Sequence, residues 1–282
     1  MLLFQLFRGK VTTAKQGDFF VSRSPTAVLR QALEAKPTAE LRRGHEWHIG
    51  NLQQLDEHSY YFAIGRVTKR TVQLWDSKAE SFTDAEYDGA PYTHAIADLG
   101  LELFAIAKKP ELAPTTNGIA RKLARLLNMA ANDPMGSRCS IDLAPIIDPT
   151  DFLESLRTAY AIQRFSATFG LPNPWDVEKD FQKPIEDFTR EVGGDKTKTT
   201  VSGANLDAHK LQDVTRSAAA TGNDVQAILQ PTSRSRPIKK SLKGDAFTYQ
   251  VESVDGASEK ADALQKARDY YQYVRDRSGR AD

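Results

Sequence analysis

Residues 59–68 have the sequence SYYFAIGRVT, which is typical of a strand inside a sheet. Successive side chains of a strand point to opposite faces, so Tyr60, Phe62 and Ile64 fall on one face and Tyr61 on the other. A strand that is apolar on both faces needs cover on both. We therefore expect a sheet whose two faces are both at least partly covered.

Extended runs surround this strand on both sides in the first hundred residues. They are HEWHIGN from His45, RTVQLWD from Arg70, PYTHAIAD from Pro91 and LELFAIAK from Leu101. The short connection between strand 59–68 and the run RTVQLWD predicts a hairpin that turns at Lys69 and Arg70. Ser24 followed by Pro25 predicts a helix start. The region is expected to form an antiparallel sheet with one early helix.

The second half of the chain mixes helices and strands. Apolar residues at helical spacing follow Pro114, and residues 132–136, NDPMG, end that helix. We expect further helices over 173–192, 205–220 and 258–275, with strands between them. The predicted class is α+β, with mostly antiparallel sheets and several helices packed on them. The predicted regions are 1–131, rich in sheet, and 137–282, which contains the basic loop 231–243 and the terminal helix.

Composition restricts the partners and the compartment. The chain has 282 residues, 38 basic and 37 acidic, so attraction to a polyanion must come from local patches. Cys139 is the single cysteine, which fits a reducing compartment, and we expect a cytoplasmic protein. The apolar start MLLFQLF is followed by basic residues and is too short to cross a bilayer, so we expect a buried strand and no membrane insertion.

The segment 231–243, PTSRSRPIKKSLK, has no acidic residue. Its cations are Arg234, Arg236, Lys239, Lys240 and Lys243. Phosphate contacts need charge and reach more than fixed geometry, so such a loop suits a nucleic-acid backbone. A solvated hairpin loop is the alternative interpretation.

Two other elements carry regularly spaced cations. Arg121, Lys122 and Arg125 lie opposite the apolar stripe of their helix, where they form a basic face or simply keep the helix solvated. Lys196 and Lys198 share one face of a predicted strand. They widen a basic groove or protect an edge strand from aggregation.

Catalytic motifs are missing from the sequence. It has no P-loop, no GxGxxG after a strand, no GxSxG and no HExxH. His45 and His48 lie three apart in a strand and so point to opposite faces, which does not favour a metal site. Glu34 and Lys36 have the spacing of a nuclease Glu-X-Lys, but at a helix end. We expect no metal and no cofactor, and no catalytic residue is identified.

Three tyrosines, at 270, 271 and 273, lie in the last predicted helix. At this spacing they are expected to be half-buried packing residues, with base stacking or a dimer contact as the alternatives. The narrow apolar stripe of the same helix makes it a candidate oligomer contact.

The order of elements resembles the RexA family of phage-exclusion proteins. The likeness is carried by Pro114-Thr115-Thr116 before a helix and by the runs SIDLAP from Ser140 and AYAIQRFSATFG from Ala159. It covers about half of the chain, and the C-terminal third departs from it. The resemblance implies a cytoplasmic bacterial defence protein that binds DNA with little sequence preference, acts as a homodimer and senses for a separate effector protein.

Three functional hypotheses follow. The leading one is a non-enzymatic protein that binds nucleic acid, DNA in particular, through the loop and helix cations. The second is a metal-dependent nuclease or phosphodiesterase built from scattered carboxylates. The third is a protein-interaction subunit, a sensor or inhibitor of a defence complex, that uses the acidic face of helix 173–192 or the last helix.

Overall fold

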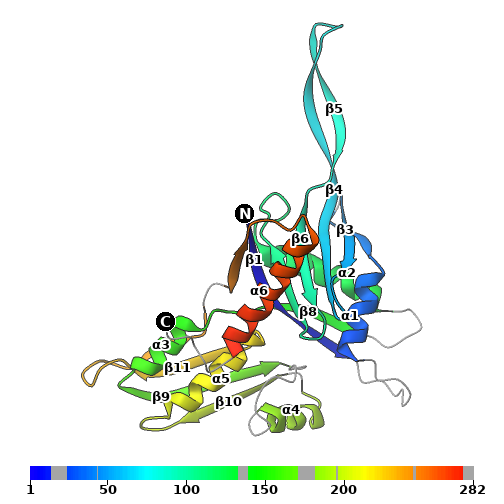
Figure 1. Ribbon diagram of the computed structural model, residues 1–282. Coiled ribbons are helices and arrows are strands. Elements are labelled where there is room, and N and C mark those ends of the chain that lie inside the picture. The colour runs from blue at the N-terminus through cyan, green and yellow to red at the C-terminus, as the bar shows by residue number, and fades with distance from the viewer. Residues whose placement is uncertain are drawn as a thin grey trace.

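The computed structural model describes residues 1–13, 24–42, 44–132, 139–170, 182–194, 196–243 and 246–275. It confirms the α+β class, with helices packed on two antiparallel sheets (Figure 1). The helices are α1 (Pro25–Glu34), α2 (Thr116–Ala131), α3 (Thr150–Thr158), α4 (Gln182–Glu191), α5 (Ala208–Ala220) and α6 (Ala257–Arg275). The strands are β1 (Leu2–Thr13), β2 (Thr38–Arg42), β3 (His45–Gln54), β4 (Ser59–Asp76), β5 (Ser81–Gly89), β6 (Tyr92–Asp98), β7 (Leu103–Ala107), β8 (Cys139–Pro145), β9 (Ala161–Gly170), β10 (Lys196–Ser202), β11 (Asp224–Gln230), β12 (Ile238–Ser241) and β13 (Thr248–Val251).

The large sheet has the strand order β13-β1-β7-β6-β4-β3-β2, with β5 also paired to β4 and β8 to β1. Both of its faces are covered, as expected. Phe7 and Phe62 point into a core shared with α1 and α2, and Phe4 and Tyr61 into a second core shared with α6 and the small sheet. The alternation in β1 and β4 therefore separates two apolar layers on either side of one sheet.

Helix starts follow the local sequence. The Ser24 hydroxyl accepts a hydrogen bond from the Ala27 amide at 3.2 Å, and Pro25 occupies the first turn of α1. Thr115 caps α2 in the same way, accepting from the Gly118 amide at 3.1 Å. Both caps satisfy amides that lack a partner within their helix.

The large sheet takes strands from both predicted regions of the chain. β8 and β13 lie beyond residues 132–136, yet both pair with β1, on the edge opposite β7. The Leu6 backbone joins them: its amide donates to the Phe247 carbonyl, and its carbonyl accepts from the Ile146 amide, each at 3.0 Å. The N-terminal strand is thus completed by residues more than 120 positions away.

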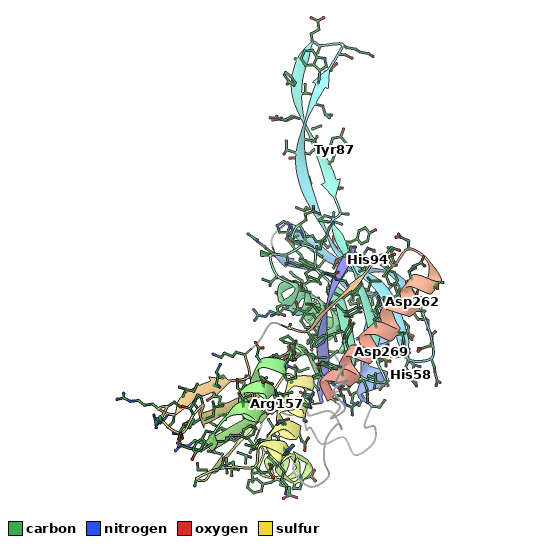
Figure 2. All side chains as sticks on the ribbon, turned by 60° about the vertical axis from the view of Figure 1, so that its left-hand side comes forward. His58, Tyr87, His94, Arg157, Asp262 and Asp269 are labelled. Atoms are coloured by element: carbon green, nitrogen blue, oxygen red, sulfur yellow. The ribbon has the colours of Figure 1, made fainter. Side chains whose placement is uncertain are left out.

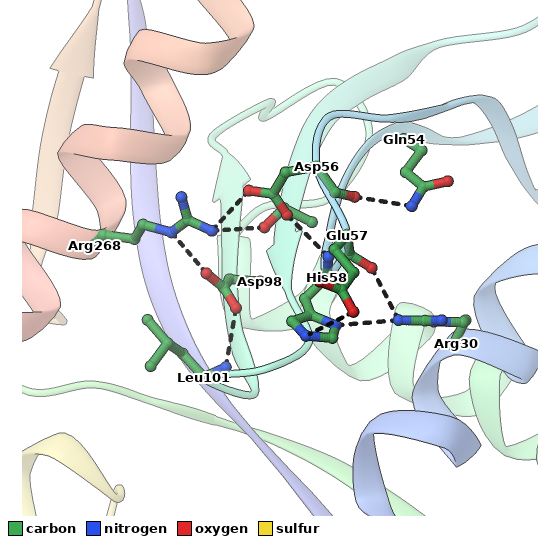
Figure 3. A network of polar contacts seen from close by, with 9 residues as sticks. Arg30, Gln54, Asp56, Glu57, His58, Asp98, Leu101 and Arg268 are labelled. Atoms are coloured by element: carbon green, nitrogen blue, oxygen red, sulfur yellow. Dashed lines mark hydrogen bonds and ion pairs between the residues drawn. The ribbon is translucent and has the colours of Figure 1, made fainter.

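Helix α6 is fastened to the large sheet by a polar network (Figure 3). The Arg268 guanidinium donates to Asp98 at 2.7 Å and to Asp56 at 2.9 Å. Asp98 is 4% exposed and also accepts from the Leu101 amide at 2.9 Å. A buried carboxylate with these partners fixes the position of the helix.

The predicted turn at Lys69 and Arg70 is wrong. β4 continues to Asp76, and the chain turns at residues 77–80, where the Asp76 carboxylate accepts from the Lys78 and Ala79 amides at 2.8 and 3.2 Å. Beyond Thr68, β4 and β5 form a two-stranded arm (residues 68–89) that projects from the body (Figures 1 and 2). Lys69 and Arg70 are not turn-forming residues, so the strand continues through them.

The small sheet has the order β10-β9-β11-β12. Phe165, Ala167 and Val225 are buried on the face that packs toward α5 and the large sheet. α4 is described over Gln182–Glu191, and the predicted first part of this helix falls within residues 171–181, which lie outside the described residues. The helical spacing of Phe188 and Val192 predicts that both point inward, but this is wrong, because they are 61% and 63% exposed.

Candidate nucleic-acid interface

The outer face of the small sheet is polar because its strands alternate. In β9, Arg164, Ser166 and Thr168 point away from the core, while Phe165 and Ala167 between them point into it. The register extends this face to both edges: Thr168 lies opposite Lys198 of β10 and Asp224 of β11. Asp224 is the one acidic residue in the four strands. An open face with this charge suits an anionic ligand.

Four cations share this outer face. They are Arg164, Lys196, Lys198 and Lys239. Arg164 lies opposite Ser202 on one side and Ile228 on the other, and Ile228 lies opposite Lys239. β10 and β12 are three strand spacings apart, about 14 Å. The separation is close to the roughly 12 Å width of the DNA major groove.

The loop between β11 and β12 extends the outer face with Arg234 and Arg236, both exposed. Thr232 and Ser235 hold the loop: the Thr232 amide donates to the Ser235 hydroxyl at 2.9 Å and the Ser235 amide to the Thr232 carbonyl at 3.1 Å. No ion pair joins either arginine to an acidic residue that the structure describes. We call the outer-face cations and these two arginines the hairpin surface.

Lys240 and Lys243 do not belong to the hairpin surface. Lys240 lies opposite Ala227, whose side chain is buried, so it points to the other side of the sheet from Lys239. Both lysines line a pocket with Asp148 and Asp151 at the start of α3. These acidic neighbours weaken the attraction of the two lysines for a phosphate. Strand alternation places Lys240 and Lys239 on opposite sides of the sheet, so the five predicted cations of 231–243 do not form one group.

The predicted cations of α2 lie elsewhere. Arg121 and Arg125 are exposed and Lys122 is half-buried, on a helix that packs on the face of the large sheet opposite the small sheet. The fold therefore does not bring the α2 cations and the hairpin surface together. Arg138, the next basic residue along the chain, lies outside the described residues.

Sequence reasoning missed that strand β2 adds to the α2 cations. α2 packs against β2, which ends at the exposed Arg42. Burial lowers the pKa of Lys122, and the positive charges of Arg125 and Arg42 lower it further. Burial likewise lowers the pKa of His45, helped by Arg66 and Arg42. We call Arg42, Arg121, Lys122 and Arg125 the helix surface.

The catalytic alternatives gain no assembled site. Glu34 ends α1 and its carboxylate accepts a hydrogen bond from the Tyr60 hydroxyl at 2.7 Å. His48 lies 3.7 Å from Glu46, and Trp47 and Ile49 are buried as core residues. In the described ranges, no three His, Cys, Asp or Glu side chains gather in a group suited to a metal ion.

The C-terminal tyrosines pack within the chain. Tyr271 is 1% exposed, and Tyr270 and Tyr273 contact the ring of Phe247 at centroid distances of 5.2 and 6.1 Å. The packing interpretation is confirmed for Tyr271, whereas Tyr270 and Tyr273 are 39% and 41% exposed. Because Tyr271 and the other apolar residues of α6 are buried against the rest of the protein, this stripe is not free to contact a second copy.

No protein-family model matches the chain, and no curated protein matches it. The layout likeness to the RexA family stays a prediction. Among the described helices, none has the length and apolar character needed to span a membrane.

Proposed function

We propose that the protein binds DNA with little sequence preference, through the hairpin surface. The observation that carries the proposal is the register of the small sheet, which gathers Arg164, Lys196, Lys198 and Lys239 on one solvent-facing side with a single acidic residue. Clustered cations of this kind bind phosphates through charge and release counterions, so they need no base contact.

The composition of the outer face favours a duplex over a single strand. Apart from Ile228, its uncharged residues have hydroxyl or amide side chains, and exposed ones such as Thr200 can donate to phosphate oxygens. The aromatic rings of β9, Phe165 and Phe169, point into the core instead. Single-strand binding without sequence preference relies on aromatic rings that stack bases. Backbone contact with a duplex is the mode that these residues support.

The test compares two variants of equal charge change in fluorescence anisotropy with a short labelled duplex. The hairpin-surface variant combines Lys198→Gln, Arg234→Gln and Arg236→Gln, and the control variant combines Lys36→Gln, Lys78→Gln and Lys108→Gln. All six residues are exposed. We expect the hairpin-surface variant to bind more weakly and its salt slope to be shallower by about 3, because each phosphate that a cation neutralises adds about 0.9 to the slope. Equal affinity of the two variants contradicts the proposal.

The arm favours a second function, self-association. Val72, Leu74 and Tyr87 lie on one face of the ribbon and are 42%, 39% and 54% exposed. Trp75 and Phe82 lie near the tip on the other face of the ribbon, 55% and 80% exposed. Figure 2 shows Tyr87 on the arm, clear of the body. Exposed apolar side chains that group on one element in this way are typical of a contact with a partner. Unpaired strand edges also favour pairing with another strand.

A second copy of the chain is the partner that the arm suits. Asp84, Glu86 and Asp88 share the opposite face of β5, which repels nucleic acid. The apolar faces of two arms can pack together and leave both acidic faces in solvent. Light scattering should find a dimer for the wild type and a monomer for a variant that combines Val72→Ser, Leu74→Ser and Tyr87→Ser, the three apolar residues of the packed face. A monomeric wild type at high concentration excludes this function.

A role in anti-phage defence is proposed on the RexA likeness alone, and phage plating on cells with and without the protein tests it.

A further inference from the structure

The helix surface has the character of a second anion site. Its cations come from two elements, Arg42 from β2 and Arg121, Lys122 and Arg125 from α2. No ion pair joins any of them to an acidic residue in the described part of the chain. The positive charges of Arg42 and Arg125 act on Lys122, and an anion that binds among these cations reduces that repulsion.

The helix surface and the hairpin surface lie on opposite sides of the large sheet. α2 covers the face that contains Phe7 and Phe62, and the small sheet packs toward the face that contains Phe4 and Tyr61. The hairpin surface is on the side of the small sheet that points away from this core. Figure 1 shows α2 and the β11 end of the molecule well apart. A straight duplex bound to one surface leaves the other exposed.

We propose that one chain binds two DNA segments at once, one on each surface, and so bridges them. The inference rests on the proposed function, because it assigns the hairpin surface to the first segment. It adds the helix surface as an independent site for a second. The near balance of charge, 38 basic against 37 acidic residues, means that neither surface is a general effect of net charge.

The stoichiometry of duplex binding gives the first test. The helix-surface variant combines Arg42→Gln, Arg121→Gln and Arg125→Gln, all at exposed positions. At protein concentrations well above Kd, we expect two short duplexes per wild-type chain, and one per chain for either surface variant. The control variant with Lys36→Gln, Lys78→Gln and Lys108→Gln keeps two. A circular dichroism melt of each variant verifies that the fold is intact.

A bridging assay gives the second test. Beads that carry one duplex capture a second, fluorescent duplex only when protein links the two. All chains in this assay also carry Val72→Ser, Leu74→Ser and Tyr87→Ser, so that an arm-mediated dimer cannot supply the second site. We expect capture by the chain with both surfaces intact and by the control variant, and at least a tenfold loss for either surface variant. Mixing the two surface variants should not restore capture, because each chain then has one site. Capture that persists in the helix-surface variant overturns the inference, since the helix surface is then not needed to bridge two duplexes.

The two proposals fail in different ways. If the wild type binds no duplex at low salt, the proposed function is wrong and the bridging inference is wrong with it. If the wild type binds one duplex per chain and captures none on beads, the inference alone is overturned. If the wild type binds one duplex per chain and the helix-surface variant binds none, the single DNA site is on α2. That result contradicts both the proposed function and the bridging inference.

Discussion

The two sheets differ in how many of their faces the protein covers. In β7 of the large sheet every residue from Leu103 to Ala107 is buried, whereas in β11 of the small sheet buried residues alternate with half-buried or exposed ones. A strand covered on both sides has no position left for a ligand. A strand covered on one side can vary half of its residues with little effect on folding.

The comparison explains where the candidate site can be. The large sheet has a core on each face and contributes structure, with Asp98 and Arg268 holding α6 to it. The small sheet leaves one face to solvent, and Lys196, Lys198 and Lys239 lie there. The proposed DNA-binding cations therefore lie where burial does not dictate the residue type.

The largest expected effect comes from truncating the core of the large sheet. Phe104 is 1% exposed, so Phe104→Ala should lower the free energy of unfolding by about 3–5 kcal/mol, because the buried ring is removed and a cavity is left behind. Lys198→Ala on the small sheet should change it by less than about 0.5 kcal/mol. Urea denaturation measures both. Similar destabilisation of the two variants would show that the outer face of the small sheet is also covered.

Local sequence predicts elements well and their neighbours poorly. The apolar pattern of residues 59–65 predicted a strand covered on both faces, and the structure confirms it. This prediction is possible because the apolar type of each side chain indicates that the side chain is buried. The pairing of β1 with β13 joins Leu3 to Gln250, and neither residue carries a sign of the other. Strand order in the large sheet depends on such long-range contacts, so it could not be predicted from local pattern.

The candidate site was predictable by residue type and not by placement. The cations of 231–243 are visible as a run, but strand register decides that Lys239 faces solvent on the same side of the sheet as Arg164 while Lys240 lines the pocket with Asp148. Arg164 is the only charged residue of its strand, and its place among the other cations appears only when β9 is placed between β10 and β11. Spatial neighbours of this kind have no one-dimensional signal.

Lys10 offers a test of the junction between the two sheets. It lies on β1 of the large sheet, and its ammonium donates to the Asn223 side chain, at 3.3 Å, in the turn before β11. Burial lowers the pKa of Lys10 to about 8, although Asp142 opposes the shift. Between this value and 10.5 the unfolded chain binds a proton that the folded chain does not, so stability rises with pH across that interval.

We expect the Lys10→Met variant to lack this rise. Its stability relative to the wild type should fall by up to about 3 kcal/mol between pH 8 and 10.5, since a shift of one pKa unit corresponds to about 1.4 kcal/mol. Chemical denaturation at several pH values measures the difference, with Lys198→Met on the exposed face as the control. Parallel stability curves for Lys10→Met and the wild type would mean that Lys10 reaches solvent and that the junction is open there.

The smallest expected effect separates two halves of one strand. Tyr61 to Ile64 of β4 lie between β3 and β6, whereas Val72 to Trp75 of the same strand pair with β5 alone in the described structure. At low protein concentration the arm amides should exchange with deuterium far faster than those of the inner half, because a two-stranded ribbon opens without disturbing a core. Phe82→Ala should change the global free energy of unfolding by less than about 1 kcal/mol, since its ring is 80% exposed and has an edge contact with Trp75.

Amide exchange followed by mass spectrometry at two protein concentrations tests whether the arm contacts a second copy. Slower exchange in the arm at the higher concentration is the result that arm-mediated self-association requires, because a second copy then covers the ribbon. Slow exchange at both concentrations would instead mean that the arm is as stable as the sheet from which it extends.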